Sequence, residues 1–393
     1  MSQLQTEDGY FDDIRPFEDS EVPGAVRSLL SDPETRALLS WLRKKTLEED
    51  DLGKISSVKA FKIVVLEPIL RDLLSKSAFS YSSSGKSSLD QTGKTKYTFI
   101  SNHRDIILDS AILNLVLWEA GLPLPEIAIG DNLLLRPWIR EVVRLSGAFI
   151  VKRSVGVRDM IAESRRLSLY MRRNITEGRS SQWIAQREGR AKDGDDRTQQ
   201  SVLKMLAMSA PEGETPVGAL KALNLVPVAF SYEYDPCDYL KALELLQKAR
   251  GTYRKEEKIS DLLSMKTGLT GYKGRIHVAI GESIGELLDQ HEAELSGRSK
   301  NDQFRAVAEM IDEAIFARYR FYPCNYIAYD LLHGTVRREG LYSKRERLKF
   351  ELYLEDRLDM LREFKETKGE RDFLYTKLLE MYANPLKNHL EHR

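Results

Sequence analysis

The stretch YTFISNHRDIILDSAILNLVLWEAG, residues 97–121, joins a short apolar strand to an apolar helix through a polar junction. Residues 97–100 are all aromatic or β-branched, which is typical of a buried strand. The spacing of apolar residues from 112 to 117 predicts a helix, which Gly121 and a proline two positions later end. His103 therefore lies at a strand-to-helix junction, where the amides of a first helical turn point toward a pocket.

A carboxylate near His103 makes this histidine a candidate general base. Asp105 and Asp109 follow it within two helical turns. An acidic partner fixes the tautomer of the imidazole and stabilises the charged ring that forms when it accepts a proton. The same pattern also fits a solvated or helix-capping histidine, so this stretch alone leaves the role of His103 open.

The composition restricts the classes to which the chain can belong. It has 393 residues, and 60 basic side chains balance 60 acidic ones, which argues against a general nucleic-acid binder but allows a local basic pocket. Two cysteines, Cys237 and Cys324, argue against a disulfide framework. No apolar run reaches the roughly 18 residues of a spanning helix, and the acidic N-terminus differs from a secretory signal. We expect a soluble, cytoplasmic chain that at most lies on a membrane surface.

Short apolar runs alternate with helical patterns along the middle of the chain. This alternation predicts an α/β fold with a mainly parallel sheet flanked by helices, and with helical N- and C-terminal extensions. The strands expected after the first are residues 127–129, 147–151, 183–185, 225–232 and 275–280, and the helices expected between them are 136–145, 157–177 and 201–209.

The pattern also divides the chain into three parts. Residues 1–80 are expected to form an arm and a helical region, residues 81–290 the α/β domain, and residues 291–393 a charged helical region. The stretch 80–96 is rich in Ser, Gly and Lys. We therefore expect an exposed loop there, which either marks a domain boundary or simply precedes the sheet.

Polar residues accompany four of the expected strands, and α/β folds place their sites at the carboxyl ends of strands. A base and a phosphate clamp at one edge would form a coherent site, because arginine binds phosphate through paired hydrogen bonds. Each group also has a purely structural interpretation, such as a solvated strand edge or a turn with a surface ion pair. The groups are His103 with Asp109, Lys152 with Arg153, Glu188 with Gly189 and Arg190, and Pro227.

These groups occur in four sequence blocks whose order resembles the glycerolipid acyltransferase superfamily, the enzymes that acylate glycerol 3-phosphate, dihydroxyacetone phosphate or 1-acylglycerol 3-phosphate. The blocks are SNHRDIILD (101–109), SGAFIVKRS (146–154), QREGR (186–190) and VPVAFSYE (226–233). The resemblance spans residues 97–235 and depends on four blocks in order rather than on any one of them. It implies the fold of this superfamily.

The chain departs from the family pattern at two places. The acid of the first block stands six positions after His103 instead of five, so either Asp109 still reaches the ring or Asp105 or a backbone carbonyl orients it. The third block lacks the family's threonine, which shifts Arg190 by one position.

The resemblance implies direct acyl transfer with no metal or redox cofactor. His103, oriented by Asp109, would deprotonate the acceptor hydroxyl, which attacks the thioester of acyl-CoA or acyl carrier protein. The remaining residues would bind substrate: Lys152 and Arg153 the phosphate of a phosphorylated glycerol acceptor, Glu188, Gly189 and Arg190 the same pocket, and Pro227 the acyl-donor side.

Two other functions stay open on the same fold. One is an N-acyltransferase that makes an amino-acid lipid, and the other is a lipid-binding relative without turnover. A lipid product implies contact with the inner face of a membrane, and the basic helix 157–173 and the Trp138 segment are candidate surfaces. An ordinary solvated basic face explains the same residues.

Overall fold

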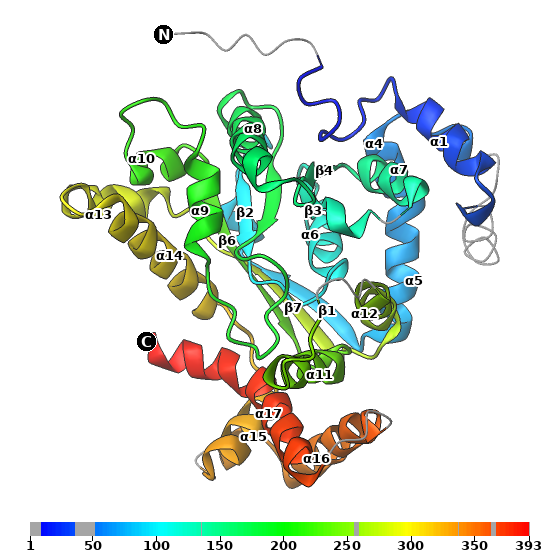
Figure 1. The fold of residues 1–393 in the computed structure, drawn as a ribbon, viewed down its shortest axis with the longest axis vertical. Helices are drawn as coiled ribbons and strands as arrows, with labels where there is room; N and C mark the ends of the chain where they lie inside the picture. The colour runs from blue at the N-terminus through cyan, green and yellow to red at the C-terminus, as the bar shows by residue number, and fades with distance from the viewer. Residues whose placement is uncertain are drawn as a thin grey trace.

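The computed structural model describes residues 9–35, 52–134, 136–254, 259–336, 338–362 and 367–392. In these ranges the strands form one seven-stranded sheet in the order β1-β7-β6-β2-β5-β3-β4 (Figure 1). Every neighbouring pair runs parallel except β6 and β7, so the mainly parallel sheet is confirmed. The strands are β1 Ser80–Ser84, β2 Thr98–Ser101, β3 Glu126–Gly130, β4 Ala148–Val151, β5 Gln182–Ala185, β6 Leu225–Tyr232 and β7 Arg275–Ile280.

Helices cover both faces of the sheet because neighbouring residues on each strand point to opposite sides. Phe99 and Trp183 pack with α5 and α6, whereas Ile100 and Ile184 pack with α8, α9 and α14. These helices and their neighbours are α5 Glu67–Ser77, α6 Leu108–Glu119, α7 Pro137–Leu145, α8 Val157–Thr176, α9 Gln200–Ala207, α10 Pro216–Lys221, α13 Gly285–Ser296 and α14 Lys300–Phe316.

Two further hydrophobic clusters lie at the ends of the chain. An N-terminal cluster packs α1 (Val22–Ser31), α4 (Val58–Phe61) and the π-helix η1 (Lys62–Leu66) against Leu145 of α7. A C-terminal cluster packs α11 (Asp238–Ala249) with α15, α16 and α17 (Figure 1). The bounds of the remaining helices are α12 Ile259–Thr270, α15 Pro323–His333, α16 Lys344–Asp359 and α17 Lys368–Glu391. The division into three domains stays a prediction.

The expectation of an exposed loop at 80–96 is wrong for its first five residues. They form edge strand β1, which pairs in parallel with β7 from Ser80 opposite Arg275 to Ser84 opposite Ala279. The hydroxyls of Ser82 and Ser84 contact the two ring nitrogens of His277 at 2.8 and 3.0 Å. The backbone pairing and these polar contacts stabilise a strand that has few apolar side chains.

Helix α17 contacts the loop that follows β5, the loop carrying the third sequence block. The Asn384 amide donates to the Asp193 carbonyl, and the Asn388 amide donates to the Asp195 carboxylate, each at 2.8 Å. Between them, Gly194 has a φ of +78°, and an added Cβ would lie 2.4 Å from the backbone oxygen of Met381. Only glycine fits this close approach to α17.

We expect Gly194→Ala to lower the free energy of unfolding by about 2–4 kcal/mol, because it adds a clash with α17 to the strain of a left-handed residue. Gly178→Ala is the matched control, since Gly178 has a similar φ of +67° but open space around its Cβ position. It should cost only about 1 kcal/mol. Urea unfolding measures both, and equal losses would show that the contact with α17 imposes no constraint.

Candidate functional site

His103 lies in the loop between β2 and α6. Its ring contacts Asp109, which the sequence pattern allowed as one alternative, with Asp105 or a backbone carbonyl as the other. Its Nδ1 is 2.9 Å from the Asp109 Oδ2, and its ring meets the Trp183 ring edge-on at 5.7 Å. A carboxylate acceptor at Nδ1 favours the tautomer that carries its proton there, which leaves Nε2 able to accept one. His103 also lines a large cavity. This geometry suits a general base.

The extra residue in the first block is accommodated because the loop turns its amides toward Asp109. The Asp109 Oδ2 also accepts hydrogen bonds from the backbone N–H groups of Arg104 and Asp105, at 2.7 and 3.0 Å. Its Oδ1 accepts one from the Tyr232 hydroxyl at 2.9 Å. Asp105 does not orient the ring: its Oδ1 instead accepts from the amides of residues 107 and 108 at the start of α6. Burial and the neighbouring Asp109 charge raise the pKa of Asp105.

Residues far away in the sequence fix this loop from outside. The Asn102 side chain makes two hydrogen bonds with the backbone of Phe230 on β6, at 2.9 and 2.8 Å. The backbone N–H of His103 donates to Asp196 at 2.7 Å. Sequence reasoning missed Asn102 and Asp196, because their partners lie 128 and 93 positions away and no local motif marks them.

A buried ion cluster holds the carbonyl next to His103. The Lys241 ammonium donates to the Arg104 carbonyl at 2.9 Å and to Asp235 at 2.5 Å. Asp235 also lies 3.4 Å from the Arg104 guanidinium. Burial raises the pKa of Asp235, but the charges of Lys241 and Arg104 outweigh it and the pKa is lowered. These residues position the loop and were also missed from the sequence.

Lys152 and Arg153, predicted to bind phosphate, both have acidic partners. The Lys152 ammonium forms an ion pair with Asp13, which also pairs with Arg166. Burial raises the pKa of Asp13, but hydrogen bonds and charge from Arg166 and Lys152 outweigh it and lower the pKa to about 2. Arg153 lies 3.5 Å from the exposed Glu188 carboxylate, so these two predicted residues from different loops meet.

Arg190 has a different environment. Its side chain is buried, with 8% of its surface exposed, and lines the cavity. No carboxylate of the described residues lies within 4.0 Å of its guanidinium, and Asp105 and Asp235 act on it only from further away. Gly189 before it has a φ of +68°, which lets the chain turn there. Arg190 is therefore a buried cation at the cavity, with no close counter-ion among the residues that the structure describes.

Lys192, which follows the third block, has a close counter-ion, and Pro227 of the fourth block lies away from the cavity. Lys192 forms an ion pair with Glu244 at 2.7 Å, and burial and the nearby Arg190 charge lower its pKa to about 8. Pro227 lies inside β6 opposite Ile100 and is not among the residues that line the cavity. Six of the eight predicted site residues thus line the cavity. The two that do not are Asp109 and Pro227.

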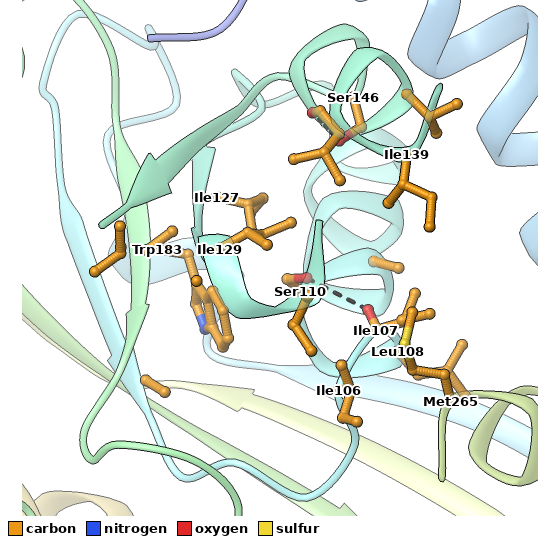
Figure 2. Close-up of a pocket in the computed structure, with 18 of the residues that line it drawn as sticks. Ile106, Ile107, Leu108, Ser110, Ile127, Ile129, Ile139, Ser146, Trp183 and Met265 are labelled. Carbon is orange, nitrogen blue, oxygen red and sulfur yellow. Dashed lines mark hydrogen bonds between the residues drawn. The ribbon is translucent and has the colours of Figure 1, made fainter. Parts of the chain in front are cut away.

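The cavity has a volume of about 1310 Å³ and a predominantly apolar wall. Figure 2 shows isoleucines from the turn before α6, from β3 and from α7 around it, together with Trp183 of β5 and Met265 of α12. Polar and charged residues gather where the strands end: His103, Lys152, Arg153, Arg187, Glu188 and Arg190. The arrangement can hold an apolar chain beside a base and a cationic group.

The described residues contain no group of three or more His, Cys, Asp or Glu side chains that could hold a metal ion. None of the helices in the described ranges is long and apolar enough to cross a membrane.

The eight predicted site residues all lie in a part of the chain that is similar to known proteins. Residues 82–231 match the family model described as Acyltransferase. Glycerol-3-phosphate acyltransferase of Pseudomonas paraeruginosa is 27% identical over 209 residues, which are 53% of this chain and 24% of that protein. Dihydroxyacetone phosphate acyltransferase of Bos taurus is 26% identical over 187 residues, which are 47% of this chain and 26% of that protein. The chain thus spans about a quarter of the length of these relatives.

One solved structure also matches, that of the 1-acyl-sn-glycerophosphate (LPA) acyltransferase PlsC from Thermotoga maritima. The two sequences are 11% identical, and the match covers 71% of this chain and 96% of the PlsC chain with a TM-score of 0.33. A likeness at this level supports no conclusion about the fold or the activity.

The loop that carries Asp196 is tied to α14 through Asp312, which gives the stability of the chain a predictable dependence on pH. Asp312 Oδ1 accepts the N–H and hydroxyl of Thr198 at 2.8 and 2.6 Å. Burial raises the pKa of Asp312 to about 6 against the lowering effect of these bonds. The folded state therefore holds the proton of the Asp312 carboxyl more tightly than the unfolded chain does. The contribution of this protonated carboxyl to the free energy of unfolding is greatest below pH 4 and is lost as the pH rises through 6.

We expect Asp312→Asn to remove a pH-dependent contribution of at most about 3 kcal/mol between pH 4 and pH 7. Urea unfolding at pH 4.5, 5.5 and 6.5 measures the difference from the unmodified chain. Glu309→Gln, an exposed position on the same helix, is the control and should leave the slope unchanged. A variant curve parallel to that of the unmodified chain would contradict the shifted pKa of Asp312.

Proposed function

We propose that the chain transfers a fatty acyl group to a phosphorylated glycerol, because residues 82–231 match the acyltransferase family model and part of the chain is similar to glycerol-3-phosphate and dihydroxyacetone phosphate acyltransferases. The donor is an acyl thioester, and the acceptor is the hydroxyl of glycerol 3-phosphate or 1-acylglycerol 3-phosphate. The observation that carries the proposal is that His103, hydrogen-bonded to the buried Asp109, lines an apolar cavity that Arg190 also lines.

The proposed reaction uses His103 twice. Its Nε2 takes the proton of the acceptor hydroxyl while the oxygen attacks the thioester carbonyl, and the buried Asp109 stabilises the resulting imidazolium. The carbon–sulfur bond then breaks, and the imidazolium returns the proton to the leaving thiolate. The products are an ester and a free thiol, so the reaction needs no metal or redox cofactor.

The apolar and the charged parts of the cavity wall would bind different parts of the substrates. The acyl chain of acyl-CoA or acyl carrier protein occupies the apolar part, because burial of methylene groups is favourable by about 0.8 kcal/mol each. The phosphate of the acceptor binds at the charged end, where no carboxylate of the described ranges lies within 4.0 Å of the Arg190 guanidinium. Lys152 supports this end indirectly, since its ammonium is already paired with Asp13.

Peripheral contact with the cytoplasmic face of a membrane is also part of the proposal. The start of α8 and the middle of α12 expose apolar side chains, of which Ile161 is 66% and Leu262 48% exposed. Met160 and Leu262 also line the cavity, so a bilayer against them would meet its wall. Trp138 is a weaker candidate than the sequence suggested, because its indole donates to Glu34 and packs in the N-terminal cluster.

The test is transfer of labelled palmitoyl groups from CoA and carrier-protein donors to glycerol 3-phosphate, 1-acylglycerol 3-phosphate, dihydroxyacetone phosphate or glycine. We expect His103→Ala to lower kcat about 10²- to 10⁴-fold, the usual contribution of a general base. Arg190→Met should raise the KM for the phosphorylated acceptor about tenfold or more, because a charge-assisted contact is lost. Lys152→Met is the matched control and should change the acceptor KM much less.

Three results would count against this assignment. Undiminished turnover in His103→Ala would exclude the base. An equal effect of Lys152→Met and Arg190→Met on the acceptor KM would move the phosphate site to Lys152. Transfer to glycine in place of a phosphorylated acceptor would identify an amino-acid lipid synthase.

A further inference from the structure

A lysine side chain contributes an ammonium group to the apolar cavity, far from the charged end. Lys62 opens the π-helix η1, is half-buried and lines the cavity. Its Nζ lies 3.2 Å from the Pro125 carbonyl and 3.4 Å from the Asn114 Oδ1 of α6. One-turn π-helices occur frequently at functional sites.

Lys62 and His103 lie at opposite ends of the sheet. Pro125 precedes β3, and an added Cβ at Gly147, before β4, would lie 2.7 Å from the Lys62 Nζ. Both places are at the amino ends of strands, whereas His103 follows the carboxyl end of β2. Figure 2 shows this length of the cavity, with Ser146 at the top and Ile106 at the bottom.

The strand register gives the distance between the two ends. Glu126 and Thr98 both pair with Gln182, so Pro125 is level with the residue before β2. Four residue steps to the end of β2, at about 3.3 Å each, separate the two levels by roughly 13 Å. An extended acyl chain advances roughly 1.3 Å per carbon for bonds of about 1.5 Å. A chain that runs along the strands from a carbonyl level with the end of β2 therefore passes the level of Pro125, which the Lys62 ammonium contacts, near its tenth carbon.

The ammonium has hydrogen-bonding capacity that the described residues do not use. It has three donor hydrogens, both of its hydrogen bonds are long, and no carboxylate of the described ranges lies within 4.0 Å. Burial, against the attraction of the more distant Glu126, lowers the pKa of Lys62 to about 8, so it is mostly charged at pH 7. A charged amine beside an unsubstituted hydrocarbon chain is costly, because burial of a polar group needs a partner.

We propose that Lys62 and Asn114 bind a hydroxyl group near the middle of the acyl chain, which makes the site selective for hydroxylated acyl donors. A hydroxyl accepts a hydrogen bond from the Lys62 ammonium and donates one to the Asn114 Oδ1. The Asn114 amide already donates to the Ser110 carbonyl at 3.0 Å, and its oxygen lies 3.4 Å from the Lys62 ammonium with a second lone pair left to accept. A carboxylate, which only accepts, would repel that oxygen. This inference rests on the proposed function.

The test compares octadecanoyl-CoA with its 3-, 10- and 12-hydroxy derivatives as donors for the unmodified chain. We expect kcat/KM for the 10- or 12-hydroxy donor to be about five- to tenfold higher than for octadecanoyl-CoA, since a hydrogen bond to a charged group outweighs the desolvation of one hydroxyl. The 3-hydroxy donor should show no gain, because its hydroxyl lies near His103. Lys62→Met should abolish the preference, because it removes the hydrogen-bond donor and should raise kcat/KM for octadecanoyl-CoA relative to the hydroxylated donors.

Lys59→Met is the matched control, because Lys59 is exposed on the preceding turn, and it should keep the preference. Equal kcat/KM for all four donors, or a preference that survives Lys62→Met, would overturn the proposal. If Lys62→Met does not fold, the comparison of donors with the unmodified chain still decides. If no acceptor is acylated, the proposed function fails, while calorimetric binding of the matching non-cleavable CoA thioethers still tests the selectivity for a hydroxyl.

Discussion

Four hydrogen bonds converge on the buried carboxylate of Asp109, from the His103 ring, the amides of Arg104 and Asp105, and the Tyr232 hydroxyl. An ionised carboxylate without exposed surface needs such donors, because an unpaired buried charge is strongly destabilising. The conformation of the turn from β2 into α6 therefore depends on hydrogen bonds to the Asp109 carboxylate. The same group joins the loop to β6, so the orientation of the imidazole depends on the sheet as well as on the helix.

The sheet could be predicted from the sequence where its strands are apolar. β6 and β7 begin and end at the expected residues, because their buried apolar runs are bounded by polar ones. β1 was missed, since its serines resemble a loop and only the pairing with β7 and the contacts to His277 stabilise it. The order of the strands in the sheet depends on contacts between distant residues, which no local pattern contains.

The candidate site was predictable as a set of residue types but not as a set of partners. His103 and Asp109 belong to one loop and the helix that follows it, so their contact was one of the alternatives that the local spacing allowed. The difference between Lys152 and Arg190 could not be predicted, because Asp13 lies 139 positions before Lys152 and forms an ion pair with Lys152 but not with Arg190. Asp196 and Lys241 were missed for the same reason. The wall of the cavity combines helices that lie far apart in the sequence, including α5 and α12.

The contacts of α17 with the loop after β5 have a consequence for how the chain is made. Asp193 and Asp195 are bonded by Asn384 and Asn388, and Gly194 lies against Met381. Ribosomes add about 5–20 residues per second, so roughly 190 further residues, tens of seconds at the slower rate, follow this loop before its partners emerge. During that interval a nascent chain can already pair β2 with β5, yet the segment that carries Arg190 lacks its clamp. The loop after β5 therefore gains these contacts only when α17 has been synthesised and has docked.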